Sequence, residues 1–151
     1  APELGEARHV ADLFGGVGLF AAAVAPRGSA VTLVESNRSA VADAEHNVPG
    51  AVIVRRDVGR WRPAAAATPI DVVVADPPRA GLGRQGTDAV VASGAATVVL
   101  VSCDPVAAAR DAALLGEQGY VHDHVSVLDL FPGTHHVETV TRFVRVLRGR
   151  S

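Results

Sequence analysis

The stretch YVHDHVSVLDLFPGTHHVETVTRFVRVL, residues 120–147, decides the fold. It contains two runs rich in β-branched residues, Tyr120–Leu128 and Val137–Leu147. Between them stand the turn-forming residues Phe131-Pro-Gly-Thr, with no helical period. Strands that are joined without a crossover helix pair antiparallel, so we expect the two runs to form an antiparallel pair at one edge of a sheet.

Upstream of this pair, short β-branched runs alternate with alanine-rich segments, which is typical of buried parallel strands joined by crossover helices. The expected strands are His9–Phe14, Ala30–Glu35, Ala51–Arg55, Ile70–Ala75 and Thr97–Ser102. The expected helices are Val17–Ala25, Arg38–Asn47, Gly86–Gly94 and Pro105–Glu117. This order predicts an α/β fold with the seven-stranded, mostly parallel, Rossmann-like sheet of class I methyltransferases. It is less typical of a dinucleotide fold, which has six parallel strands.

The composition predicts one soluble domain. A chain of 151 residues can bury its own core, and its single cysteine cannot form an internal disulfide. No stretch is long and apolar enough for a signal peptide or a membrane span, so we expect a cytoplasmic protein without a membrane partner. The net charge of −2 gives no overall attraction to nucleic acid, although four arginines lie near the C-terminal end. Because the chain contains no methionine, we expect residues 1–151 to be a fragment of a longer protein.

Polar residues follow each expected parallel strand, at the sheet edge where ligands bind in folds of this kind. After the first strand, Gly15, Gly16 and Gly18 allow a tight turn and the close approach of a ligand to the backbone. Glu35 ends the second strand, where a carboxylate can accept both ribose hydroxyls of a nucleoside. Asp57, after the third strand, can accept from an adenine amino group or cap a turn. These residues fit S-adenosylmethionine (SAM) and NAD alike; the alternatives are a βα turn without a ligand and, for Glu35, a charge that favours a helix dipole.

The fourth corner favours SAM over NAD, and the fifth holds a candidate nucleophile. Asp76-Pro77-Pro78 holds the backbone extended, because proline fixes φ and disfavours helix at the preceding residue. Acidic-Pro-Pro corners are characteristic of methyltransferases that act on a planar base, whereas a stiffened turn is the alternative. Cys103 precedes a helix that begins at Pro105, and a helix N-terminus favours the thiolate form of a nucleophile. An inert buried thiol is the alternative there.

The turn between the last two strands ends in His135, His136 and Glu138. A metal site is a weak interpretation, because neighbouring residues of a strand point to opposite faces and no further ligands stand at a suitable spacing. Glu138 is a candidate general base or, alternatively, a solvated charge at a strand end. We therefore expect no metal.

In their order along the chain, these motifs resemble those of the SAM-dependent RNA uracil-5 methyltransferases, which make 5-methyluridine in tRNA and ribosomal RNA. The segments that carry the resemblance are Asp12–Phe20, Val34-Glu35 with Ala40, Ala44 and Asn47, Asp76–Gly81, Val101–Asp111 and Asp129–Glu138. The first two are shared with many methyltransferases, and the last two are specific to the family.

The resemblance implies a role for each matched position. Cys103 is the implied nucleophile, Glu138 the base, and Asp76 a residue that faces both cofactor and uracil. The implied SAM site consists of Phe14, Gly16, Gly18, Leu19, Glu35, Asp57 and Asp76. The chain departs from the family pattern at Gly15, where cysteine is usual, and at Asp104, where asparagine is usual. It also lacks the family's Phe-x-Gln segment and RNA-binding domain, which lie upstream of the first strand.

We therefore predict the catalytic domain of an enzyme that methylates carbon 5 of a uridine in tRNA or rRNA. In such chemistry a thiolate adds to carbon 6 and activates carbon 5, and a base later removes the carbon 5 proton. The target base must leave its stack, which RNA loops allow at low cost. An NAD-binding Rossmann domain of an oxidoreductase and a non-catalytic SAM-binding module remain the alternatives.

Overall fold

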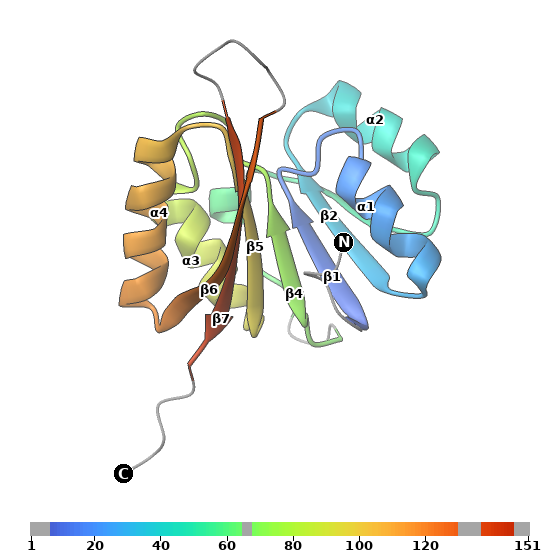
Figure 1. Cartoon of the computed structure of the whole chain (residues 1–151). Helices are drawn as coiled ribbons and strands as arrows, with labels where there is room; N and C mark the ends of the chain where they lie inside the picture. Colours follow the sequence, from blue (N-terminus) through green and yellow to red (C-terminus); the bar gives the residue numbers. More distant parts are fainter. Residues whose placement is uncertain (1–6, 65–67, 130–136, 147–151) are drawn as a thin grey trace.

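The computed structural model describes residues 7–64, 68–129 and 137–146. They form a seven-stranded sheet with the order β3-β2-β1-β4-β5-β7-β6 (Figure 1). The first five strands are parallel, whereas β7 pairs antiparallel with both β5 and β6. Their bounds are β1 His9–Leu13, β2 Ala30–Glu35, β3 Val52–Arg55, β4 Val72–Ala75, β5 Thr97–Ser102, β6 Tyr120–Leu128 and β7 Glu138–Arg145. The predicted fold class, with its antiparallel C-terminal pair, is confirmed.

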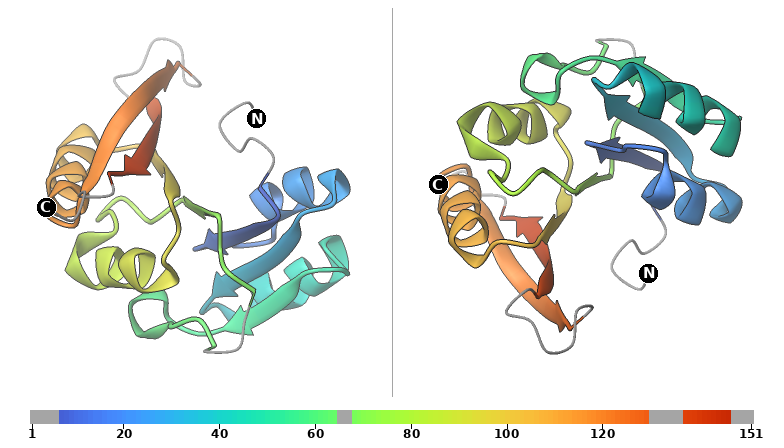
Figure 2. Two further views of the ribbon diagram at one scale, coloured as in Figure 1. Left: turned by 90° about the horizontal axis from the view of Figure 1, so that it is seen from below. Right: turned by 90° about the horizontal axis from the view of Figure 1, so that it is seen from above.

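Helices cover both faces of the sheet (Figure 2). The helices α1 (Leu19–Val24) and α2 (Arg38–Asn47) lie on one face, and α3 (Gly83–Ser93) and α4 (Pro105–Glu117) on the other. Alternate strand residues feed the two resulting cores: Val10 packs with the α1 side, and Ala11 packs with the α3 side. Two short 3₁₀ turns, η2 (Ala25–Arg27) and η3 (Val58–Arg60), follow α1 and β3.

Several element boundaries differ from the sequence prediction by one to three residues, and local contacts explain three of the differences. Strand β1 ends at Leu13 because Phe14 has a φ of 60°, which turns the chain out of the sheet. Helix α1 ends early, since Pro26 follows it in η2. Helix α3 begins at Gly83 instead of Gly86, because the buried carboxylate of Asp111 accepts the backbone N–H groups that open this helix.

The topology places the chemistry at one edge. Strand β1 pairs with both β2 and β4, so the chain changes direction across the sheet at this point, and ligands bind beside such switch points at the carboxyl ends of the strands. Because β7 runs antiparallel to β5, its first residue, Glu138, lies at that same edge. All five predicted corners therefore meet there.

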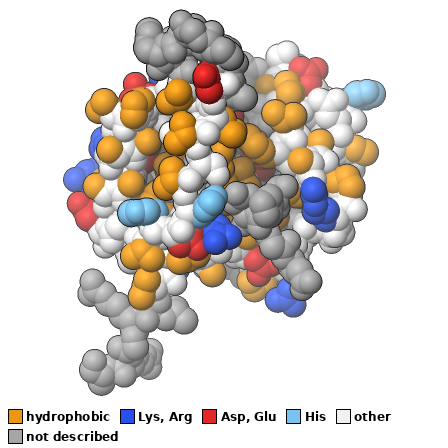
Figure 3. All heavy atoms as spheres, viewed as in Figure 1, with side chains coloured by type: hydrophobic (Ala, Val, Ile, Leu, Met, Phe, Trp, Pro, Cys, Tyr) orange, Lys and Arg blue, Asp and Glu red, His pale blue; other side chains and the backbone are white. Residues whose placement is uncertain are grey.

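The surface is apolar in places. Hydrophobic side chains are spread over the face seen in Figure 3, and the edge strand β6 leaves Val121, Val125, Val127 and Leu128 exposed. Over the described ranges, no helix is long and apolar enough to cross a membrane.

Candidate active site

The glycine loop after β1 packs tightly on one side and is open on the other. A Cβ at Gly15 would overlap the Leu33 side chain, and a Cβ at Gly18 would lie 2.8 Å from Val48 Cγ2. Gly16, with a φ of +54°, has no heavy atom within 4 Å of the position that a Cβ would take. Its bare backbone therefore faces free space, as a loop that receives a cofactor requires.

Glu35 fixes this loop from the neighbouring strand. Its Oε2 accepts from the N–H of Gly16 at 3.0 Å, and its Oε1 accepts from the N–H groups of Ser36 and Asn37, each at 2.7 Å. The carboxylate therefore does more than favour a helix dipole. Oε1 also accepts from the Ser36 hydroxyl at 3.4 Å, so it is fully used. Each carboxylate oxygen offers about two acceptor positions, so Oε2, which accepts only from Gly16, keeps one for a hydroxyl of a ligand.

Asp12 is a functional candidate whose individual role the sequence analysis missed. Its carboxylate is completely buried, and Oδ2 accepts from the N–H of Ala21 at 3.0 Å. Oδ1 has no hydrogen-bond partner among the described residues. Burial raises the pKa of Asp12 to about 7 against the opposing effect of the Ala21 N–H, and the charges of Asp76 and Glu35 add to the rise. An acidic residue inside an apolar strand was the signal in the sequence.

The other predicted cofactor residues border the loop and the next corner. Phe14 is half-buried and packs against the core, and Leu19, the first residue of α1, is 71% exposed. Asp57 precedes η3 but makes no capping hydrogen bond with its side chain. The turn-cap alternative for Asp57 is therefore wrong, and its carboxylate is exposed at the edge.

Asp76 leaves β4 at the centre of the edge. Its N–H donates to the carbonyl of Leu13 at 3.3 Å, which ties the acidic corner to the glycine loop. Partial desolvation raises the pKa of Asp76, and the charge of Glu138 raises it further. The Glu138 carboxylate, at the start of β7, therefore acts on the carboxyl that follows β4.

The loop after Asp76 is held by Asp111, which the sequence analysis included in a motif without a role. The Asp111 carboxylate is buried in α4 and accepts from Leu82 N–H at 2.6 Å and Gly83 N–H at 3.0 Å. The guanidinium of Arg110 pairs with it at 2.9 Å and donates to the Ala80 carbonyl. Asp111 thus positions the loop of the fourth corner from the helix of the fifth.

Cys103 lies between β5 and the N-terminus of α4, as predicted. Asp104 caps this helix by accepting from Ala107 N–H at 2.8 Å, and Pro105 occupies the first turn. Ser102 donates its hydroxyl to the Asp104 carbonyl at 3.0 Å. Cys103 is half-buried, so the alternative of a fully buried core thiol is not what the structure has. The aspartate that replaces the usual asparagine acts as a helix cap.

The sheet brings Glu138 to Cys103. Ser102 pairs with Thr139 in the antiparallel register of β5 and β7, and the Thr139 hydroxyl donates to the Ser102 carbonyl at 3.1 Å. Cys103 and Glu138 each lie one residue beyond this pair, at the same edge. The thiol of Cys103 and the carboxyl groups of Glu138 and Asp76 therefore lie at the same edge of the sheet.

His135 and His136, the weak metal candidates, lie outside the described residues. Within the described ranges, no group of three or more His, Cys, Asp or Glu side chains could hold a metal ion. Acid–base and nucleophilic chemistry are what the arranged side chains offer.

Comparison with known proteins points in one direction. The family model described as tRNA (Uracil-5-)-methyltransferase matches residues 66–145. A Streptomyces avermitilis protein described as an uncharacterized RNA methyltransferase is 43% identical over 135 residues, which cover 85% of this chain and 31% of that protein. The 23S rRNA (uracil(1939)-C(5))-methyltransferase RlmD of Chromohalobacter salexigens is 39% identical over 153 residues, covering 97% of this chain and 31% of the relative.

Solved structures agree. The Pyrococcus abyssi tRNA (uracil-54, C5)-methyltransferase, solved with S-adenosyl-L-homocysteine, superimposes with a TM-score of 0.79 and 33% identity, over 89% of this chain and 34% of that one. A TehB-like SAM-dependent methyltransferase of Corynebacterium glutamicum, at 16% identity and a TM-score of 0.71, shares the fold. The chain spans about a third of the length of the Streptomyces, Chromohalobacter and Pyrococcus abyssi proteins.

Proposed function

Because the chain belongs to the tRNA (uracil-5-)-methyltransferase family, we propose that it methylates carbon 5 of a uridine in RNA and uses SAM as the methyl donor. The observation that carries this proposal is the Ser102–Thr139 pair, because the next residue after Ser102 and the one before Thr139, Cys103 and Glu138, both follow it toward the carboxyl edge. We also propose that the chain is the catalytic region of the protein, since it spans about a third of its relatives.

The described residues fit the cofactor. The open backbone at Gly16, the remaining acceptor capacity of Glu35 and the exposed carboxylate of Asp57 suit a nucleoside with ribose hydroxyls and an adenine amino group. Phe14, Gly18, Leu19 and Asp76 border the same space. When bound, SAM supplies the electrophilic methyl group that carbon 5 accepts.

The residues of the chain supply the two other parts of the reaction. The Cys103 thiolate forms a carbon–sulfur bond at carbon 6 of uracil, and the displaced electron pair makes carbon 5 nucleophilic. Once carbon 5 carries the methyl group, Glu138 removes its proton, and the electron pair left behind re-forms the ring double bond. The carbon–sulfur bond breaks in that same elimination and its electron pair returns to sulfur, so Cys103 leaves the reaction as it entered.

Asp76 has a separate role in this proposal. In its protonated form, which the raised pKa makes more populated than in a free aspartate, the Asp76 carboxyl can donate a hydrogen bond to a uracil oxygen. Negative charge develops on that oxygen when the thiolate adds, and a donor aimed at developing charge lowers the barrier.

A 5-fluorouridine RNA tests the proposal, because fluorine at carbon 5 leaves Glu138 no proton to remove. We expect mass spectrometry of the natural gene product, incubated with this RNA and SAM, to find a stable covalent complex. Cys103→Ala removes the attacking sulfur and is the matched control. Identical spectra for the wild type and Cys103→Ala would refute the covalent mechanism, and a protein that binds SAM without methylating any RNA would be a non-catalytic module.

A further inference from the structure

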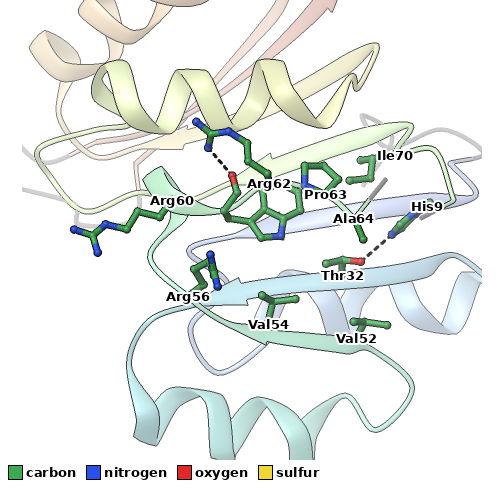
Figure 4. Close-up of a pocket in the computed structure, with 11 residues that line it drawn as sticks. His9, Thr32, Val52, Val54, Arg56, Arg60, Arg62, Pro63, Ala64 and Ile70 are labelled. Carbon is green, nitrogen blue, oxygen red and sulfur yellow. Dashed lines mark hydrogen bonds between the residues drawn. The ribbon is translucent and has the colours of Figure 1, made fainter. Parts of the chain in front are cut away.

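A cavity of about 500 Å³ lies beside the edge strand β3 (Figure 4). Three strands, β2, β1 and β4, separate β3 from β5, which precedes Cys103. Val52 and Val54 form its floor, with Thr32 from β2. Because side chains alternate along a strand, Arg56 lies on the same face as these two valines. The indole of Trp61 forms a wall of the cavity. Trp61 is only 4% exposed, so it also belongs to the core.

Arginines stand at one end of this cavity. Four of the chain's 14 basic residues fall within residues 55–62, and Arg56, Arg60 and Arg62 line the cavity. Arg62 donates to the carbonyls of Gly59 and Trp61. Figure 4 shows Arg56 and Arg60 at the carboxyl end of β3, with His9 and Ile70 at the opposite end.

These guanidinium groups have no anionic partner in the described part of the chain. The ion pairs there join Arg110 with Asp111 and Arg142 with Asp123, and neither involves the cavity. A chain with a net charge of −2 thus concentrates unpaired positive charge at one place, next to an apolar floor. Phosphates bind such arginines, and the flat face of a base can pack against the valines.

The cavity and the reacting centre are within reach of one RNA strand. Both Arg56 and Cys103 follow the carboxyl ends of parallel strands, β3 and β5, in a sheet where β2, β1 and β4 lie between them. Four strand spacings of about 4.8 Å place the two ends about 19 Å apart. A short single-stranded segment can therefore contact Arg56 while another of its nucleotides reaches Cys103.

We propose that the cavity beside β3 holds a single-stranded segment of the substrate RNA outside the reacting uridine. Arg56 and Arg60 bind its phosphates, and Val52 and Val54 contact a ribose or base. The identity of the ligand as RNA rests on the proposed function, whereas the anionic site itself rests on the geometry of the cavity.

The test is fluorescence anisotropy of the chain with a short fluorescein-labelled oligouridylate over a series of salt concentrations. For the double variant Arg56→Gln/Arg60→Gln we expect roughly tenfold weaker binding at low salt, because two phosphate contacts are lost. The slope of log affinity against log salt should fall by about 1.4, since each contact to a single strand contributes about 0.7. Arg27→Gln is the matched control, because Arg27 is exposed at the opposite end of the strands.

Two results would overturn the site: an unchanged slope in the double variant, or a wild-type chain that does not bind the oligonucleotide. Poly-L-glutamate as a competitor tests the other class of anion, and displacement of RNA at equal charge would make this an acidic-polypeptide site. Calorimetric titration with S-adenosylhomocysteine on the same samples distinguishes a failure of the cavity proposal from a failure of the proposed methyl transfer. The double variant should bind it like the wild type, and a wild type that does not bind it would count against methyl transfer alone.

Discussion

The glycine loop, Gly15–Gly18, and the corner that follows β5, Ser102–Pro105, lie at the same edge of the sheet but are held by different kinds of contact. The loop is tied by Asp12 to Ala21 and by Glu35 to Gly16, contacts that span 9 and 19 positions of the chain. The nucleophile corner depends on Thr139 and Ser102, which are 37 positions apart. Carboxylates fix the first region, and strand register fixes the second.

The part of the edge that we propose binds SAM therefore depends on other contacts than the part that we propose carries out the reaction. The loop is anchored by elements from the first half of the chain. Asp12 and Glu35 belong to β1 and β2, and Asn47 at the end of α2 donates to the Val17 carbonyl at 2.9 Å. Glu138 reaches Cys103 only when β7 inserts between β5 and β6 in the observed register, and a slip of one residue would turn Glu138 to the other face. Perturbations of the two regions should therefore have different consequences.

The largest expected effect concerns the buried carboxylate of the loop. The pKa of Asp12 is raised from 3.8 to about 7, a difference of about 3 units, which corresponds to about 4 kcal/mol. A group with a raised pKa contributes its full stability below pH 3.8 and loses it as the pH rises to about 7. We expect Asp12→Asn to remove this loss, so that its free energy of unfolding falls less between pH 4 and 8.

Urea unfolding at several pH values measures the effect, with Asp43→Asn on the exposed side of α2 as the control. A wild type and an Asp12→Asn protein whose stabilities change in parallel with pH would show that the Asp12 carboxylate does not titrate in this range.

Steric crowding at the loop should give the next largest effect. A Cβ at Gly15 overlaps Leu33 in the core, so Gly15→Ala should destabilise the fold by about 3 kcal/mol. Gly28→Ala is the contrast: its φ of +83° is strained for alanine, but the space around it is open, so it should cost about 1 kcal/mol. Equal denaturation midpoints for the two variants would mean that Leu33 moves aside.

Glu35→Gln tests binding through the loop, because the Glu35 carboxylate both holds the loop and offers an acceptor to a ligand. A charge-assisted hydrogen bond is worth about 2 kcal/mol, so Glu35→Gln should weaken S-adenosylhomocysteine binding about 30-fold. Calorimetric titration measures this, and Glu45→Gln, an exposed carboxylate on α2, should bind like the wild type. If both variants bind equally well, the ribose assignment is wrong. Tighter binding of NADH than of S-adenosylhomocysteine would instead favour the dinucleotide alternative.

The smallest expected effect lies in the second region. Thr139→Val removes the hydroxyl that donates to Ser102 and should lower stability by about 1 kcal/mol. Thr141→Val is matched to it, since Thr141 lies two positions along the same strand and its side chain makes no hydrogen bond to a described residue. The rate of adduct formation should fall in Thr139→Val alone, and an equal fall in both variants would point to a general effect on β7.

Much of the fold could be predicted because its signals are local. The runs Ala30–Glu35, Thr97–Ser102 and Tyr120–Leu128 are strands with the predicted bounds, since each is a β-branched segment between turn residues. The cap at Asp104 and the proline after it likewise marked the start of α4.

The parts that could not be predicted depend on contacts between distant residues. The first turn of α3 is set by Asp111, 29 positions from Leu82, and no local pattern reports that hydrogen bond. The Asp12 oxygen without a hydrogen bond and the cavity beside Arg56 also depend on how distant segments pack, so the sequence pattern could not predict them. The candidate side chains of the site could be predicted from the sequence. The structure adds the register of β5 and β7, which brings Glu138 to the same edge as Cys103.

The central claim is that Cys103 and Glu138, on neighbouring strands, act on one uracil. The most direct measurement is mass spectrometry of Glu138→Gln in the natural gene product, incubated with unmodified RNA and SAM. If Glu138 removes the carbon 5 proton, a methylated covalent complex should accumulate in Glu138→Gln and be absent from Cys103→Ala/Glu138→Gln. Turnover by Glu138→Gln at the wild-type rate, with no trapped complex, would contradict the account.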